Sequence, residues 1–147
     1  MLGLPCSVLG LVLRGWAAGH LAKDRELATS GPYAYLRNPL YIGTLVTAFG
    51  LVVAAHNAWL ALLFALVFFL VYLPAVELEE QHLRTIFSAY AGYANYVNRF
   101  VPGRRYVSGQ QAFSMSLYLR NEEYKATLGW CIAVAWLVWK CWFARAA

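Results

Sequence analysis

Apolar residues dominate the chain, and polar residues gather in two long segments and one short turn. The longest apolar run, residues 38–76, contains no Asp, Glu, Lys or Arg. A helix that crosses the hydrocarbon core of a bilayer needs roughly 20 apolar residues, so this run is long enough for two spans. His56 and Asn57 provide a polar turn inside it. The pattern therefore predicts helices over residues 39–55 and 58–76.

Two further apolar stretches lie near the ends of the chain, at residues 4–22 and 127–143. Each is long enough to cross a bilayer as a helix. Arg14 and His20 interrupt the first stretch, and polar groups within a span are costly, so both are candidates for substrate binding. The pattern thus predicts an all-α integral membrane protein with about four transmembrane helices, in a single domain over residues 1–147.

The remaining segments are polar. The helix over residues 58–76 is expected to continue as a polar extension through residues 77–87, with a kink at Pro74, which has no backbone N–H. Residues 101–116 contain Gly, Arg and Gln and are typical of a loop. Residues 118–125 are expected to form a short helix at the membrane interface.

Charge places these polar segments on one side of the membrane. Lys and Arg are concentrated in residues 23–38 and 77–126, whereas the turn at residues 56–57 has neither. By the positive-inside rule, both basic segments are predicted to be cytoplasmic and to form a cap there. The net charge of +5 does not indicate nucleic-acid binding, because the basic residues flank apolar spans. Only 13% of residues are charged, against about 25% in soluble domains, which excludes a water-soluble globule.

The first candidate for chemistry is the motif GPYAYLRNPLYIG at residues 31–43. Asn38 and Pro39 are typical of the N-cap and the first position of a helix. The free N–H groups of that helix start, together with Arg37, would suit a small carboxylate. In the alternative interpretation Arg37 is an anchor to lipid head groups, and spacing alone does not separate the two. Three tyrosines lie in the same motif: Tyr33, Tyr35 and Tyr41.

The second candidate is the adjacent pair Glu79 and Glu80, at the end of the third apolar helix. Neighbouring residues on a helix lie about 100° apart, so the two side chains cannot point the same way. One of them is expected to face the interior and to take a cationic partner. A solvated helix face is the alternative, because Glu80 and Arg84 have the spacing of a surface pair.

Two periodic patterns complete the set. Tyrosines recur every third residue, and they indicate either an aromatic belt at the membrane interface, which the spacing favours, or a wall for a flat ring such as adenine. These are Tyr90, Tyr93 and Tyr96. Small residues recur at helical spacing in the second apolar helix and indicate close packing against another helix. They are Gly43, Thr47 and Gly50.

Taken together, GPYAYLRNPLYIG, EEQHL and RFVP resemble the motifs of the isoprenylcysteine carboxyl methyltransferase family, which is related to the phospholipid methyltransferases. The resemblance covers about residues 14–102. It implies a bacterial inner-membrane protein that holds S-adenosylmethionine on its cytoplasmic face and takes a lipid-like acceptor from the bilayer. Three features depart from the family pattern. The eukaryotic members have His at the position of Asn38 and Arg at the position of Ala75, and Ser88 stands where Phe-Gly is usual, with the spacing after it one residue shorter.

The resemblance also implies which residues hold the cofactor. They are Arg25, Glu26, Leu27, Ala28, Tyr33, Arg37, Asn38, Pro39, Leu40, Tyr41, Glu79 and Glu80. Candidates for a part in catalysis are Arg37, Asn38, Tyr41 and Glu80. Arg14 and His20 are six residues apart, or roughly 9 Å of helix rise, and could flank one acceptor head group.

The expected function is transfer of a methyl group from S-adenosylmethionine to a carboxylate of a lipid-like or prenylcysteine-like acceptor. Methyl transfer is a direct displacement that depends on alignment and on exclusion of water, so no metal is expected. Three alternatives stay open: a phospholipid or amine N-methyltransferase, a sterol-reductase-like enzyme that uses NADPH, and a lipid-binding membrane protein without catalysis.

Overall fold

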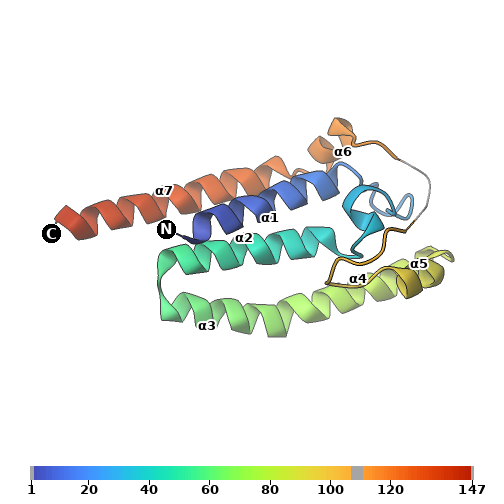
Figure 1. Cartoon of the computed structure of the whole chain (residues 1–147), viewed down its shortest axis with the longest axis horizontal. Coiled ribbons are helices and arrows are strands. Elements are labelled where there is room, and N and C mark those ends of the chain that lie inside the picture. Colours follow the sequence, from blue (N-terminus) through green and yellow to red (C-terminus); the bar gives the residue numbers. More distant parts are fainter. Residues whose placement is uncertain (1, 107–110, 147) are drawn as a thin grey trace.

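The computed structural model describes residues 2–106 and 111–146, and this part of the chain is helical, with no β-strand. Figure 1 shows long helices packed side by side, with a smaller cap at one end of them. The N-terminus and the turn between α2 and α3 lie at the end away from the cap. The elements are α1 (Gly3–Ala18), the 3₁₀ turn η1 (Gly31–Ala34), α2 (Pro39–Ala55), α3 (Ala58–Val67), the π-helical turn η2 (Phe68–Tyr72), α4 (Leu73–Ile86), α5 (Tyr90–Tyr96), α6 (Met115–Arg120) and α7 (Tyr124–Ala146).

Two of these helices are long and apolar enough to cross a membrane. The first is the continuous helix Ala58–Ile86, formed by α3, η2 and α4, and the second is Tyr124–Phe143 within α7. The helices α1 and α2 are apolar as well, but shorter. The all-α architecture with apolar helices is therefore confirmed over the described residues, while a count of four spans stays a prediction.

The bounds of α2 agree with the predicted ones, α1 ends earlier than predicted, and α7 extends the predicted helix 127–143 at both ends, over Tyr124–Ala146. The helix α2 covers the predicted residues, but α1 ends at Ala18 and not at residue 22. There the Asn121 side chain donates hydrogen bonds of 2.9 Å to the carbonyls of Ala18 and Leu21, which satisfies groups that a longer helix would have bonded internally. The helix expected at residues 118–125 is shifted: α6 ends at Arg120, and a turn separates it from α7.

A π-helical turn marks the position of the expected kink. Pro74 lacks an N–H, and its ring crowds the carbonyl of Leu70, four residues earlier. The π-helical turn η2 ends two residues before Pro74. Its wider hydrogen-bond spacing accommodates the proline ring, so the helix continues past Pro74. The polar extension of the third helix consequently continues through Ile86, as the sequence predicted.

The helices α1 and α2 pack with their backbones almost in contact. A Cβ atom added to Gly10 would lie 2.5 Å from the carbonyl oxygen of Gly43, and one added to Gly50 would lie 2.4 Å from the backbone nitrogen of Ser7. No side chain fits at these positions, so the small-residue face expected on α2 is confirmed as a helix-packing surface.

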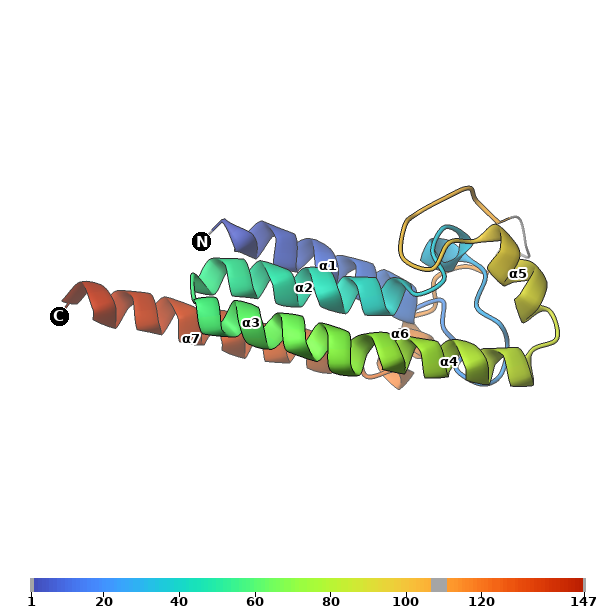
Figure 2. The ribbon, with the colours of Figure 1, turned by 90° about the horizontal axis from the view of Figure 1, so that it is seen from below.

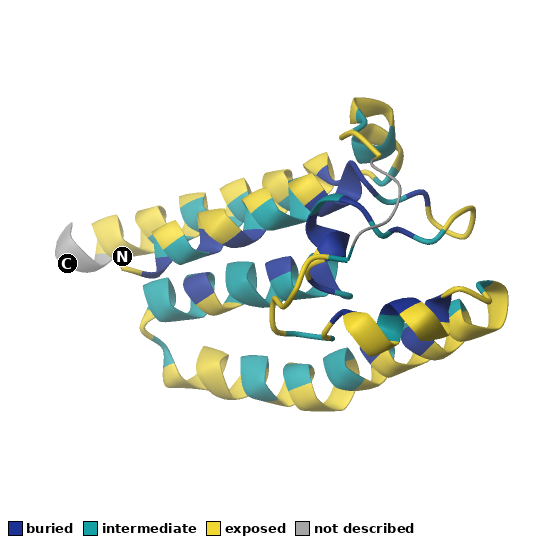
Figure 3. Ribbon diagram, turned by 45° about the vertical axis from the view of Figure 1, so that its right-hand side comes forward, coloured by how far each residue is buried: buried dark blue, intermediate teal, exposed yellow. Residues whose placement is uncertain are grey.

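Burial is concentrated in the cap and along the contact between α1 and α2. Figure 3 shows buried positions along the α1–α2 contact and in the cap, whereas the outer faces of α3 and α7 are exposed. The largest fully buried side chains include Tyr90, Tyr93 and Glu80, all of them in the cap. The exposed surface of the long helices is apolar, as in Trp59 and Ile132, which a surrounding bilayer would cover.

Candidate functional site

The candidate site is a pocket in the cap, between the segment that follows α1, the start of α2, the polar helix α4 and the short helix α5. Figure 2 shows these elements gathered at one end of the long helices. The pocket is lined by Leu21, Lys23, Asp24, Glu26, Leu27, Ala28, Tyr33, Arg37, Asn38, Leu40, Tyr41, Glu79, Leu83, Phe87, Tyr90 and Tyr93.

Most of the predicted cofactor residues meet in this pocket. Those that line it are Glu26, Leu27, Ala28, Tyr33, Arg37, Asn38, Leu40, Tyr41 and Glu79. Three others are absent from its wall among the described residues. Pro39 is buried in the first turn of α2, Glu80 points elsewhere, and Arg25 lies in a separate hollow of the cap.

The two adjacent glutamates have different environments. Glu79 lines the pocket and forms no ion pair within the described ranges. Glu80 is 1% exposed and accepts hydrogen bonds from Arg37 Nη1 at 3.2 Å and from Asn38 Nδ2 at 2.8 Å. Arg99 adds two more, from Nε at 3.1 Å and from Nη2 at 2.7 Å. The expected interior glutamate with a cationic partner is thus Glu80, and the solvated-face alternative is wrong for it.

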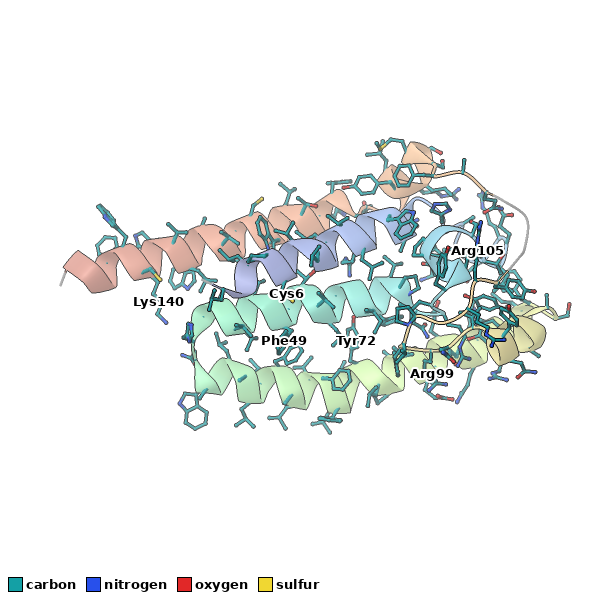
Figure 4. All side chains as sticks on the ribbon, viewed as in Figure 1. Cys6, Phe49, Tyr72, Arg99, Arg105 and Lys140 are labelled. Carbon is teal, nitrogen blue, oxygen red and sulfur yellow. The ribbon has the colours of Figure 1, made fainter. Side chains whose placement is uncertain are left out.

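Arg99 is a site residue that the sequence reasoning assigned no role. It lies in the RFVP motif after α5, and its guanidinium also reaches Glu77 at 2.9 Å. Figure 4 shows Arg99 extending across the space between α4 and the start of α2. The signal in the sequence is only one arginine in a mixed segment, and nothing local indicates that its partner lies nineteen residues earlier.

The start of α2 has a different cap from the predicted one. Asn38 occupies the N-cap position, but its side-chain oxygen accepts no capping hydrogen bond, and its Nδ2 donates to Glu80. The first turn of α2 therefore keeps its positive end free of a side-chain cap. Beside it, Arg37 Nε is buried and has no hydrogen-bond partner among the described residues.

Buried tyrosines form the part of the pocket wall beside Arg37. Tyr90 and Tyr93 are 1% and 2% exposed, so the aromatic-belt interpretation is wrong for these two. Tyr93 Oη donates to the carbonyl of Tyr33 at 2.7 Å, whereas Tyr90 Oη is buried next to the Arg37 guanidinium without a well-aligned hydrogen bond to it. Burial raises the pKa of both hydroxyls, and that of Tyr33, so they stay neutral and can donate hydrogen bonds at pH 7.

Arg14 and His20 are not brought together. Arg14 donates to Glu123 from Nε at 3.0 Å and from Nη2 at 2.7 Å, and its Nη1 contacts the hydroxyl of Thr44. His20 Nδ1 lies 3.0 Å from the hydroxyl of Ser30, and the ring borders a different hollow. Both side chains are thus held by the protein and lie outside the pocket wall, so they do not flank one common position.

A hydrophobic groove approaches the pocket along α2. Leu45, Val46 and Phe49 of α2 face Phe64 and Phe68 across it. Tyr41, Leu45 and Phe49 are spaced four residues apart on α2, so one face of this helix runs from the pocket into the groove. At the junction Tyr72 Oη donates to the carbonyl of Tyr41 at 2.7 Å, and Figure 4 shows Tyr72 and Phe49 between the same helices.

Comparison with known proteins agrees with the motifs. The profile of the phospholipid methyltransferase family matches residues 3–90. The cobalt-zinc-cadmium resistance protein CzcN of Cupriavidus metallidurans is 30% identical over 125 residues, which cover 82% of this chain and 56% of that protein. No solved structure matches the chain.

Two relatives are named as methyltransferases. Phosphatidylethanolamine N-methyltransferase B of Dictyostelium discoideum is 28% identical over 102 residues, or 60% of this chain and 50% of that protein. The Protein-S-isoprenylcysteine O-methyltransferase of Schizosaccharomyces pombe is 35% identical over 81 residues, or 54% of this chain and 34% of that protein. The chain thus spans about half, or less, of the length of these curated relatives.

Proposed function

The chain belongs to the phospholipid methyltransferase family, and we propose that it transfers a methyl group from S-adenosylmethionine to a lipid-like acceptor. The observation that carries the proposal is the pocket itself. Nine residues that the family resemblance assigns to the cofactor meet there, together with the buried hydroxyl of Tyr90. The preferred reaction is O-methylation of a carboxylate.

The donor set of the pocket fits the chemical groups of S-adenosylmethionine. Arg37 Nε and the uncapped start of α2 suit its carboxylate. The carboxylate of Glu79 suits its ammonium or ribose hydroxyls. Tyr90 and Tyr93 offer neutral hydroxyls and aromatic rings to the adenine and the sulfonium. When bound, the cofactor supplies an activated methyl group on sulfur.

The protein's part in such a displacement is alignment and exclusion of water. Glu80 holds Arg37 and Asn38 by hydrogen bonds, so the carboxylate end of the pocket is fixed before any ligand arrives. The buried side chains of Tyr90 and Tyr93 exclude water from the part of the pocket wall beside Arg37. A carboxylate acceptor is already a nucleophile at pH 7, so it needs no general base.

Amine N-methylation is a second candidate that one observation favours. An ammonium acceptor must lose a proton before it can attack, and Glu79 is a carboxylate in the pocket wall without an ionic partner in the described residues. The match to the phospholipid methyltransferase profile supports the same candidate. The two reactions give different products, a base-labile ester and a base-stable amine.

We further propose that α1, α2, the apolar part of the helix Ala58–Ile86 and α7 span a bacterial inner membrane, with the cap on the cytoplasmic face. The support is their side-by-side packing and the basic residues of the cap. The apolar groove beside Phe49 would then face the lipid, and an acyl or prenyl chain lying in it would direct the acceptor head group toward Tyr41.

Titration of the purified protein with S-adenosylhomocysteine tests the cofactor assignment. Calorimetry in detergent should show saturable binding, and NADPH should not compete. A folded protein that binds NADPH, or neither ligand, would contradict the proposal in favour of the reductase or the non-catalytic alternative. Incubation of native membranes with methyl-labelled S-adenosylmethionine, followed by alkaline hydrolysis of the labelled lipids, then separates ester from amine products.

A further inference from the structure

A second hollow of the cap carries three cations that have no ionic partner in the described residues. Lys23, Arg25 and Arg120 line it, in a volume of about 300 Å³ between the segment after α1 and helix α6. The carboxylate of Asp24 also lines it and lies 3.3 Å from His82. Since one carboxylate faces three cationic side chains, the hollow has a net positive charge that the described residues around it do not neutralise.

The position of α6 relates this hollow to the membrane surface. Figures 1 and 2 show α6 at the level where the long helices end and the cap begins. Met115 and Leu119 lie one turn apart on α6 and are 60% and 54% exposed. Leu117 and Arg120 line the hollow from another side of the same helix. The short helix therefore has an unburied apolar face next to a basic one, which is typical of helices that lie in a membrane interface.

We propose that this hollow binds the phosphate of an anionic phospholipid that is distinct from the methyl acceptor. Arginine matches phosphate oxygens with two parallel N–H groups, and Arg25 and Arg120 are both available for this. The exposed Met115 and Leu119 would rest against the acyl region of the same leaflet. A free phosphate would use the cations but not the apolar face of α6, so the two features together select a lipid.

The hollow shares a wall with the pocket. Leu21, Lys23 and Asp24 line both, and the Asn121 side chain at the end of α6 is bonded to the carbonyl of Leu21. A lipid phosphate held by Lys23 and Arg25 would fix this shared segment in place. Since coupling between two sites is reciprocal, the anionic lipid should tighten binding in the pocket, and a pocket ligand should tighten binding of the lipid.

Binding of phosphatidylglycerol by the purified full chain tests this inference without any pocket ligand, so its outcome is independent of the proposed function. The test variant is Arg25→Gln with Arg120→Gln, and Lys23 is left intact because it lines the pocket. The control is Arg104→Gln with Arg105→Gln, which removes the same charge from exposed residues that are not part of this hollow. The affinity for phosphatidylglycerol is measured for the wild type and for both variants, each in phosphatidylcholine nanodiscs that contain increasing fractions of phosphatidylglycerol.

Each basic residue near an anionic headgroup contributes about five-fold in affinity, so the test variant should bind phosphatidylglycerol about 25-fold more weakly. The control variant should bind it like the wild type, and both should keep the thermal unfolding midpoint of the wild type in pure phosphatidylcholine. Equal losses in the two variants would overturn the site. Inorganic phosphate that displaces the lipid at equal concentration would overturn its assignment to a phospholipid.

Discussion

Glu79 and Glu80 are neighbours in the chain, yet one carboxylate faces the pocket and the other is buried among Arg37, Asn38 and Arg99. Their positions on α4 differ by one residue, or about 100° of helix rotation. The two glutamates, which are adjacent in the motif, therefore have different roles in the structure. Glu80 holds the cap together, and Glu79 is the group that a ligand would meet.

Substitution of each glutamate by glutamine should therefore give opposite results. Glu80→Gln leaves two arginines around an uncharged side chain and should lower the free energy of unfolding by about 3 kcal/mol. Glu79→Gln should leave stability unchanged and weaken S-adenosylhomocysteine binding by about 1.5–3 kcal/mol. Thermal unfolding and calorimetry on the same preparations measure both. Unchanged ligand affinity in Glu79→Gln would remove Glu79 from the proposed site.

Removal of the hydroxyl of Tyr90 should also have a different effect from removal of the hydroxyl of Tyr93. Tyr93→Phe removes the hydrogen bond to the Tyr33 carbonyl and should cost about 1 kcal/mol of stability. Tyr90→Phe removes a buried hydroxyl that lies next to the Arg37 guanidinium without a well-aligned hydrogen bond, so it should cost less stability than Tyr93→Phe. If Tyr90 Oη contacts the cofactor, only Tyr90→Phe should combine this smaller loss of stability with weaker binding. Equal losses of stability in Tyr90→Phe and Tyr93→Phe would contradict the predicted difference between the two hydroxyls.

Arg14 can be tested together with its partner Glu123, which lies in the turn before α7. Arg14→Leu leaves the 8% exposed Glu123 unpaired and should lower stability by about 3 kcal/mol. Replacing both residues by leucine should recover most of the loss, because neither charge is then buried alone. Turnover separates the two roles of Arg14. If Arg14 serves only to pair with Glu123, the double variant should regain activity. If Arg14 also contacts the acceptor, the double variant should stay impaired.

The contact between α1 and α2 should not accept even one methyl group. A Cβ at Gly50 would lie 2.4 Å from the Ser7 nitrogen, so Gly50→Ala must push the helices apart and lower the unfolding midpoint. Gly129→Ala on α7 is the matched control, because nothing lies within 4 Å of its added Cβ. Alanine is the better helix former by about 1 kcal/mol, so the control should be neutral or stabilising.

Orientation is testable by labelling single cysteines in a variant that lacks the three native ones. A cysteine at Asn57, in the turn between α2 and α3, should react with a membrane-impermeant maleimide on intact cells. One at Asn95, on the exposed side of α5, should react only after permeabilisation. The reverse pattern would place the pocket outside the cytoplasm and contradict the proposed access to the cofactor.

The sequence predicted those features that depend on local pattern. The bounds of α2 follow from an Asn-Pro start and a polar turn, and the structure places them at Pro39–Ala55 as predicted. The nine residues that meet in the pocket were predicted because the family resemblance covers the segments on either side of the two apolar helices, and the local pattern alone does not single them out.

What was missed depends on contacts between distant residues. The end of α1 is set by Asn121, 103 residues later, and the partner of Arg14 is Glu123, 109 residues later. The amide of Asn38 donates to Glu80, which lies beside it in space and not in the sequence. Sequence spacing carries no information on such pairs.

The carboxylate of Glu80 joins the three pieces of the sequence motif in one place. Arg37 and Asn38 come from the first piece, Glu80 from the second and Arg99 from the third, and the other three side chains all donate hydrogen bonds to the buried carboxylate of Glu80. A descendant of this chain that lost Glu80 alone would leave Arg37 and Arg99 without their shared partner inside the cap, whereas loss of one arginine would leave the other to pair with Glu80. Evolution can therefore remove Glu80 only together with its cationic partners, and relatives that have lost Glu80 should also have replaced Arg37 or Arg99.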